Sequence, residues 1–397
     1  MRKLNRLLLS SFLCLSFNLQ AAQDYGVSEG NEELLIQGLD SLASQQFDTA
    51  LKQFKELTEK RPDFRLAQLV YADLLASQVN PLGAIGSDVT RKQEIQGLIE
   101  EARARLRVNK DKPAAGLLPE GLVKMSADQR YVIVVDTNFS RLFLFENRKG
   151  TPYLLKDYYA SYGRGGTDKV RQGDLKTPLG VYFITARYSD EMLPERYGSG
   201  ALPLNYPNQW DIRNGRTGSG IWLHGSPVDT YSRPPQASEG CVSLTNPDFI
   251  DLNRLVDINN TPVLIGHNMK WVSRAQWQTQ QKEIATVVEQ WRKDWESRDH
   301  KRYISHYSKQ FNDGSSNYAA FANYKARVNG SKSFIKVNLE NLSIYRYPND
   351  PNLMVATFKQ DYQSDNYKGV SIKRQYWLKE GNVWRIAFEG DPSRGIP

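Results

Sequence analysis

The chain has 397 residues, of which 40% are hydrophobic and 11% aromatic, so it can bury two or three domain cores and is not largely disordered. The formal net charge is +8, but no run of Lys and Arg is dense enough to indicate a nucleic-acid partner. A mildly basic chain of this kind suits an anionic polymer as its partner.

Residues 1–22 have the pattern of a secretory signal peptide. Three basic side chains precede the apolar run Leu7–Phe17, which is too short to span a bilayer, and two alanines follow near the expected cleavage point. An uncleaved membrane anchor is the alternative. Cleavage would remove Cys14 and leave Cys241 as the single cysteine, which excludes an internal disulfide and a Cys-rich metal site. No metal and no cofactor is expected.

Residues 23–108 carry apolar side chains at the three-and-four spacing of amphipathic helices. The expected helices are Asn31–Ser44, Phe47–Lys60, Leu66–Ala76 and Ile95–Val108. Residues at the offsets of a tetratricopeptide repeat of about 34 residues are Gly38, Ala50, Phe54, Leu57, Pro62 and Ala72. We therefore predict a small all-α, tetratricopeptide-like domain, which either offers a docking surface to a protein partner or packs against the rest of the chain.

Residues 109–121 are punctuated by Pro and Gly, and we interpret them as a linker. Strand-like runs follow, and the expected elements are strands at Tyr131–Asp136, Arg141–Glu146, Tyr153–Tyr162, Tyr182–Ala186 and Pro262–Ile265, with a short helix at Asp248–Val256. The Gly-rich loop Gly163–Gly173 lacks a phosphate-binding motif, so a nucleotide site is rejected. The aromatic and Pro-rich segment Ser189–Trp210 is either the wall of a substrate groove or a structural loop.

One stretch in the middle of the chain holds the residues best suited to catalysis. The apolar run Ile221–Leu223 predicts a buried strand that ends at His224, and Val242–Leu244 predicts a second strand directly after Cys241. Strands that lie side by side would bring the imidazole within hydrogen-bond reach of the thiol, so that it takes the proton and leaves a thiolate. Gly240 lets an acyl group approach closely and helps to aim backbone N–H groups at a developing oxyanion.

Two ordered motifs resemble those of the YkuD-type L,D-transpeptidase catalytic domain of bacterial cell-wall enzymes. The first is His-Gly, a spacer and Ser/Thr-x-Gly-Cys-hydrophobic, matched by His224, Gly225, Ser238, Gly240, Cys241 and Val242. The second is Thr-Pro-x-Gly-x-aromatic, matched by Thr177, Pro178, Gly180 and Tyr182. The resemblance implies a mainly-β catalytic domain over residues 122–268. Many members carry His at the position of Glu239.

The resemblance also implies roles for individual residues. Cys241 would be the nucleophile and His224 the general base, with a backbone carbonyl near Ser226 orienting the imidazole. Gly240 and Ser226 are expected to support the oxyanion site. The candidate substrate-binding residues are Gly225, Ser238 and Arg233.

The pattern changes again over residues 275–397. Helical spacing at Ile284–Arg298 continues through Asp299–Phe311 and Phe321–Ala326. Five strand-like runs follow, at Lys332–Leu339, Asn341–Tyr347, Leu353–Tyr362, Val370–Glu380 and Val383–Glu389. Helices followed by an antiparallel sheet predict an α+β cone, and the pattern resembles the NTF2-like fold. We expect an accessory domain that binds peptide or glycan, or that dimerises, and a multidomain protein as a whole.

A YkuD-type domain followed by an NTF2-like domain is similar to the arrangement in cell-shape-determining L,D-carboxypeptidases of helical bacteria. The resemblance implies a periplasmic enzyme of the Gram-negative envelope, which acts through a Cys acyl-enzyme on the diaminopimelate–D-alanine bond of peptidoglycan stem peptides. The acyl acceptor would be an amine in a 3–3 cross-linking transpeptidase and water in an L,D-carboxypeptidase. An amidase that releases wall-linked lipoprotein is a further alternative, and a non-catalytic wall-binding scaffold is the alternative of another class.

Overall fold

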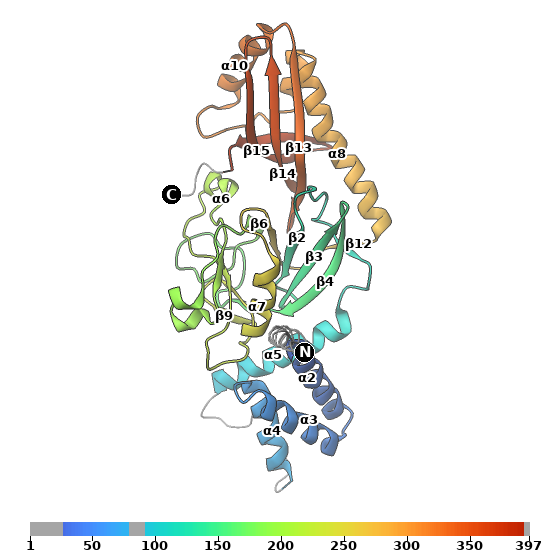
Figure 1. Ribbon diagram of the computed structural model, residues 1–397, viewed down its shortest axis with the longest axis vertical. Helices are drawn as coiled ribbons and strands as arrows, with labels where there is room; N and C mark the ends of the chain where they lie inside the picture. Colours follow the sequence, from blue (N-terminus) through green and yellow to red (C-terminus); the bar gives the residue numbers. More distant parts are fainter. Residues whose placement is uncertain (1–26, 79–91, 393–397) are drawn as a thin grey trace, which may run out of the picture.

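The computed structural model describes residues 27–78 and 92–392, so the signal peptide predicted over 1–22 lies outside the described residues. Figure 1 shows an elongated molecule, with the N-terminal helices at one end, a β-rich domain in the middle and a domain of long strands and helices at the other end. The predicted multidomain class, with helical, mainly-β and α+β parts in that order, is confirmed. None of the helices within the described ranges is both long enough and apolar enough to cross a membrane.

Helices make up the described N-terminal domain: α2 (Val27–Ala43), α3 (Phe47–Lys60), α4 (Arg65–Ser77) and α5 (Lys92–Asp111). Helix α3 shows why they pack, because Ala50, Phe54 and Leu57 lie on one face at helical spacing and are buried. They share a core with Leu35 of α2 and Val70 of α4. The helices agree with the predicted ones to within a few residues, whereas their tetratricopeptide character stays a prediction.

The segment 109–121, predicted as a linker, is ordered by secondary structure at two places. Helix α5 continues through Asp111, and Leu118–Pro119 form β1, which pairs antiparallel with β12 (Trp271–Val272). The sequence pattern did not predict these elements. Pro and Gly residues surround them, and a strand as short as β1 has no periodicity of its own. Pairing with β12 ties the start of the catalytic domain to the segment that leads into the C-terminal domain.

The middle domain is built on a five-stranded sheet. Its strand order is β4 (Thr151–Tyr159), β3 (Arg141–Arg148), β2 (Tyr131–Asp136), β11 (Pro262–Gly266) and β6 (Gly180–Phe183). Strands β2 and β11 are parallel neighbours and are buried at every residue, which explains their unbroken apolar sequences. Ile133 and Leu144 belong to the core on one face of the sheet, and Val134 and Phe143 to the core on the other.

A smaller sheet carries the segment around the two catalytic candidates. Its strand order is β10 (Val242–Ser243), β8 (Trp222–His224) and β7 (Ala201–Pro203). The neighbouring elements are β5 (Tyr162–Gly163), its partner β9 (Gln236–Ser238), the 3₁₀ turns η2 (Asp190–Met192) and η3 (Glu195–Tyr197), and the helices α6 (Gln209–Arg213) and α7 (Asn246–Leu255). Helix α7 begins after Thr245, whose hydroxyl caps it by accepting the N–H of Asp248 at 3.2 Å. This cap fixes where β10 stops.

The C-terminal domain combines helices with a long antiparallel sheet. The helices are α8 (Arg274–Glu296), α9 (His300–Ser305) and α10 (Tyr318–Gly330), and the strands are β13 (Ile335–Tyr347), β14 (Asp350–Ser364), β15 (Lys368–Glu380) and β16 (Val383–Gly390). Helix α8 starts well before the predicted Ile284, because Ser273 and Gln276 form a capping box and the first turns are mostly polar. The two strands predicted on either side of residue 340 are wrong, since they form one strand, β13, with an irregularity between Glu340 and Ser343.

The C-terminal sheet shares a hydrophobic core with the catalytic sheet. Tyr345 and Tyr347 of β13 belong to the same buried cluster as Phe143 of β3. Lys124 and Ile344 exchange backbone hydrogen bonds of 2.9 and 2.8 Å. The two domains are therefore joined by a packed, hydrogen-bonded surface, which fixes the C-terminal domain on the back of the sheet that supports the site.

Candidate active site

Strands β8 and β10 bring the predicted catalytic pair to one surface. They run parallel with Leu223 opposite Val242, so Cys241 lies beside Trp222 when the register is continued by one residue. Side chains alternate along a strand, and therefore Trp222 and His224 face the same side. Cys241 lies opposite Trp222 in the continued register and so faces that side as well. The two sequence motifs thus meet through the pairing of two very short strands.

His224 is buried, and a backbone carbonyl holds its ring. Nδ1 lies 2.6 Å from the carbonyl oxygen of Gly225, which can only accept a hydrogen bond, so Nδ1 carries the proton and Nε2 keeps its lone pair. The hydroxyl of Ser243 donates to the same oxygen at 3.1 Å. Burial lowers the pKa of His224 from 6.5 to about 4, and the charges of Arg233 and Arg196 act in the same direction. The imidazole is neutral near pH 7, as a general base must be.

Cys241 is a neutral thiol in the free site. Its Sγ donates to the carbonyl oxygen of Gly220 at 3.3 Å. Burial raises the pKa of the thiol above its usual value, although the N–H of Trp222 and the guanidinium groups of Arg196 and Arg233 lower it. Burial disfavours both the thiolate and the imidazolium, so the expected transfer of the thiol proton to the imidazole stays a prediction.

Gly240 and Ser238 build the turn in front of the nucleophile. Gly240 has a φ of +128°, and its N–H donates to the hydroxyl oxygen of Ser238 at 3.1 Å. The hydroxyl of Ser238 donates in turn to the carbonyl oxygen of Cys241 at 2.6 Å. Ser238, predicted to bind substrate, therefore uses its hydroxyl inside the turn. The N–H of Gly240 is engaged as well, so the oxyanion donor expected at this turn is the N–H of Cys241.

Gly225 and Ser226 act through packing. A Cβ atom on Gly225 would lie 2.9 Å from the backbone nitrogen of Ser199, so a side chain does not fit there. The hydroxyl of Ser226 donates to the carbonyl oxygen of Leu244 at 2.7 Å and is buried. The side chain of Ser226 thus holds the end of β10, and the backbone carbonyl predicted near Ser226 to orient the imidazole is that of Gly225.

Arg233 lies on the loop between His224 and Cys241 and is partly buried. Its guanidinium donates to the carbonyl oxygen of Ala237 and interacts electrostatically with the sulfur of Cys241 and with Glu239. Burial lowers the pKa of Arg233 from its usual value, and these two negative partners oppose that shift. Among the predicted substrate-binding residues, Arg233 is the one that brings a positive charge to the nucleophile.

Further residues around the catalytic candidates complete the site. The ring of Tyr197 meets that of His224 edge-on at 5.1 Å, so the segment Ser189–Trp210 forms a wall of the site as well as a loop. The side-chain oxygen of Asn246 accepts the N–H of Ser199 at 2.9 Å. The aromatic pattern of Ser189–Trp210 marked the segment of Tyr197 in advance, whereas no pattern in the sequence pointed to Asn246.

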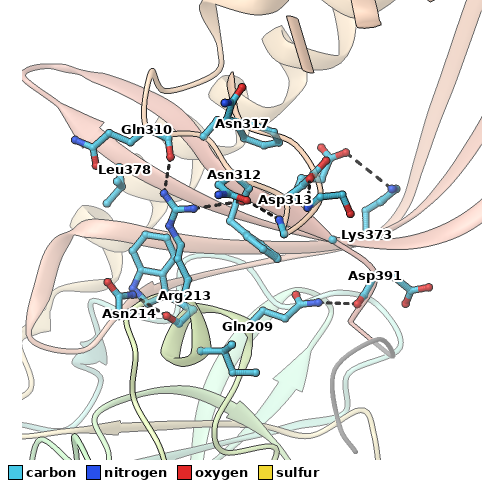
Figure 2. A pocket seen from close by; sticks show the side chains of 18 of the residues that line it. Gln209, Arg213, Asn214, Gln310, Asn312, Asp313, Asn317, Lys373, Leu378 and Asp391 are labelled. Carbon is cyan, nitrogen blue, oxygen red and sulfur yellow. Dashed lines mark hydrogen bonds and ion pairs between the residues drawn. The ribbon is translucent and has the colours of Figure 1, made fainter. Parts of the chain in front are cut away.

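A separate cavity of about 1300 Å³ opens between α6 and the C-terminal domain (Figure 2). Arg213 of α6 donates to the carbonyl oxygen of Asn312 at 3.2 Å and lies among polar side chains from both domains. Neither His224 nor Cys241 lines this cavity. Within the part of the chain that the structure describes, no group of three or more His, Cys, Asp or Glu side chains is placed to hold a metal ion.

Comparisons with known proteins match both large domains. The family model YkuD, the L,D-transpeptidase catalytic domain, matches residues 130–265, and the model of the Cds6 C-terminal NTF2-like domain matches residues 283–390. The structure of Bd1075 from Bdellovibrio bacteriovorus is similar over 69% of this chain and 98% of that chain, with 30% sequence identity and a TM-score of 0.62. A comparison with curated protein sequences gave no significant match.

The helical cell shape determining protein Pgp2 from Campylobacter jejuni has the same fold. It is similar over 68% of this chain and 95% of that chain, with 23% identity and a TM-score of 0.59. The matched residues 130–265 contain both sequence motifs and the paired strands β8 and β10, which place His224 and Cys241 on the same side. The chain therefore belongs to the YkuD L,D-transpeptidase family, as a member that carries a Cds6-type NTF2-like domain after its catalytic domain.

Proposed function

We propose that this protein is an exported cysteine enzyme that modifies peptidoglycan by cleaving the bond between diaminopimelate and the terminal D-alanine of tetrapeptide stems. The observation that carries the proposal is the neutral His224 imidazole, oriented by the carbonyl of Gly225, on the same surface as the Cys241 thiol. Membership of the L,D-transpeptidase family supports an acyl transfer at an L-centre. The signal-like sequence of residues 1–22 supports export to the periplasm.

Acylation begins with a proton transfer that accompanies the attack. Nε2 of His224 takes the thiol proton as Sγ of Cys241 bonds to the carbonyl carbon of diaminopimelate, and the carbonyl electrons move to oxygen. The N–H of Cys241, aimed by the turn at Gly240, stabilises this oxyanion. One such donor is worth roughly 3–4 kcal/mol in a transition state. The intermediate then collapses to a thioester, and the imidazolium returns its proton to the departing amine of D-alanine.

Deacylation uses the same two side chains. The neutral imidazole of His224 removes a proton from the acceptor, which attacks the thioester carbonyl, and the sulfur of Cys241 leaves and is reprotonated. Water as acceptor gives a trimmed tripeptide stem and a free carboxylate, whereas an amine gives a cross-link. We propose water as the acceptor. The support for this choice is the arrangement of domains, which this chain shares with the helical cell shape determining protein Pgp2.

The experiment uses residues 23–397 and a Cys241→Ala variant with purified disaccharide-tetrapeptide, followed by mass spectrometry. The expected product is the disaccharide-tripeptide with release of one D-alanine, formed by the native enzyme and not by the variant. A product dimer joined through two diaminopimelate residues would show that the acyl acceptor is an amine and not water. A folded native protein that leaves the tetrapeptide intact would overturn the proposal, and a lipoprotein-linked muropeptide would then be tested as the amidase substrate.

A further inference from the structure

The loop between the two catalytic residues is held by the N-terminal helical domain. This loop, residues 227–237, leaves β8 after His224 and returns through β9 to Cys241. Its side chains do not pack only within the catalytic domain. Tyr231 belongs to the hydrophobic core of the helical domain and is buried. The core of the helical domain thus includes a residue of the active-site loop, and this shared core couples the helical domain to the catalytic domain.

Tyr231 is bound on several sides by the helical domain. Its backbone N–H donates to the carbonyl oxygen of Asp63 at 3.1 Å. Its ring lies 4.7 Å from that of Phe64, and the guanidinium carbon of Arg61 lies 4.5 Å from the ring centre. Aromatic and cation–π contacts of this kind add to the stabilisation that comes from burial of the ring.

The next loop residue reaches a buried charge cluster on α5. The hydroxyl of Ser232 donates to the carboxylate of Glu101 at 2.6 Å, across 131 positions of sequence. Glu101 is also paired with Arg105 at 3.0 Å, and Arg105 with Glu32 of α2 at 3.0 Å. Both Glu101 and Arg105 are almost fully buried, so this network exists only while α5 is packed against the loop.

The catalytic domain holds the same loop from the opposite side. The hydroxyls of Tyr159 and Ser161 donate to the carbonyl oxygen of Arg233 at 2.9 and 3.0 Å. The guanidinium carbon of Arg105 lies 3.9 Å from the ring centre of Tyr159, which connects this side to the helical network. The backbone of Arg233 is thus held by the catalytic domain next to residues held by the helical domain, while its guanidinium donates to Ala237 and acts electrostatically on Cys241.

Helix α5 also approaches the loop closely. A Cβ atom on Gly97 would lie 2.9 Å from the side chain of Pro234, so the helix touches the loop directly at a residue without a side chain. The charged or titratable groups that act on the thiol of Cys241 are Arg196, Arg233 and Glu239. Of these, only Arg233 lies on the clamped loop.

We propose that the helical domain is a positioning unit of the active site, in which Tyr231 and Glu101 fix the loop so that Arg233 stands beside Cys241 and binds a carboxylate of the acyl donor. The identity of the donor rests on the proposed function, since the terminal D-alanine carries its free carboxylate directly beside the scissile bond, whereas that of diaminopimelate lies at the far end of its side chain. The positioning itself does not depend on that assignment. It also explains why a helical domain accompanies this catalytic domain without requiring a protein partner.

The test follows the reaction of Cys241 with iodoacetamide across pH in the full chain without its signal segment. The variants are Tyr231→Ala, Ser232→Ala and Arg233→Gln, each alone, and the first two also combined with Arg233→Gln. Ser77→Ala is the matched control, because its hydroxyl donates only to Leu74 within the helical domain, at 2.6 Å. Loss of the positive charge beside the sulfur raises the pKa of the thiol, and one unit slows alkylation about tenfold below that pKa.

We expect Arg233→Gln and Tyr231→Ala each to slow alkylation by about 3- to 10-fold near pH 7, Ser232→Ala to do so more weakly, and Ser77→Ala to leave the rate unchanged. In the Arg233→Gln background, Tyr231→Ala should add little, because both changes remove the same charge. With tetrapeptide substrate, these variants should raise KM more than they lower kcat.

An unchanged alkylation profile in folded Ser232→Ala and Tyr231→Ala would overturn the proposal, and so would an effect that persists in full without Arg233. Alkylation requires no substrate, so its result is separate from that of the proposed function. If the variants show the expected coupling but the native protein does not cleave tetrapeptide, the positioning role of the helical domain stands and the proposed acyl donor is wrong.

Discussion

The hydroxyl of Thr177 donates a 2.9 Å hydrogen bond to the carbonyl oxygen of Gly240, the residue directly before the nucleophile. The same hydroxyl oxygen accepts the backbone N–H of Gly163 at 2.9 Å, and the side chain is fully buried. Thr177 thus connects the two sequence motifs physically, because it ties the Thr-Pro segment to the turn that aims Cys241.

Replacing Thr177 by Val should damage this turn while keeping the shape of the side chain. The N–H of Gly163 and the carbonyl of Gly240 would lose their partner, which costs about 1–3 kcal/mol for a buried polar group. We expect a lower free energy of unfolding and a lower kcat, measured by denaturant unfolding and by tripeptide formation. Thr177→Ser keeps the hydroxyl and should stay close to the native enzyme. Equal losses in both variants would contradict the hydrogen-bond explanation.

Gly240→Ala should be strongly harmful. Its φ of +128° is strained for any residue with a Cβ, and that atom would lie 2.8 Å from the carbonyl oxygen of Lys176. We expect a loss of about 1–3 kcal/mol of stability and a marked fall in turnover, because the turn aims the oxyanion donor. Gly150→Ala is the control, since Gly150 has a φ of +84° and open space around it. If Gly150→Ala were as inactive as Gly240→Ala, the local explanation would fail.

The acid limb of kcat/KM should lie far below the usual titration of histidine. His224 acts as a base only when neutral, and its folded pKa is lowered to about 4 by burial. Activity is therefore lost as pH falls through about 4, instead of through the unperturbed value near 6.5. The measurement is tripeptide formation between pH 3.5 and 8 at low substrate concentration. A limb near 6.5 would mean that the imidazole is solvated in the working enzyme.

The catalytic and C-terminal domains should unfold together. Tyr345 of β13 is 1% exposed within the shared core, and its hydroxyl donates to the side-chain oxygen of Gln129 at 2.6 Å. Tyr345→Ala should cost about 3–5 kcal/mol by opening a cavity, with one calorimetric transition shifted as a whole. Tyr324→Ala, at a position 52% exposed, should change stability by about 0.5 kcal/mol or less. A shift confined to a separate C-terminal transition would contradict the shared core.

Cys241→Ala and His224→Ala should each abolish turnover and leave a folded protein. Their side chains supply the nucleophile and the base, and residues that act as one unit each cost nearly the whole effect, at least about 10³-fold in kcat. The measurement is tripeptide formation together with a circular dichroism spectrum. Residual activity of a folded Cys241→Ala variant near that of the native enzyme would exclude the thioester mechanism.

Local patterns predicted most of the secondary structure. The strand at Tyr131–Asp136 and the helix at Phe47–Lys60 have the predicted bounds, because an unbroken apolar run and a helical stripe each signal their own element. The start of α8 was missed although Ser273 and Gln276 form a readable capping box, since the apolar periodicity becomes regular only later. The predicted division of β13 fell at residue 340, beside the register shift between Glu340 and Ser343, where Asn341 has a φ of +53° and the strand continues.

The sequence by itself determined the family and marked the candidate nucleophile and base, because His224, Cys241 and the Thr-Pro segment form ordered motifs with family-typical spacing. Only the tertiary structure decided the protonation of the pair, since burial by distant segments raises the pKa of Cys241 and lowers that of His224. It also decided that the helical domain holds the active-site loop. Contacts such as that of Ser232 with Glu101 join residues 131 positions apart, and no local pattern encodes them.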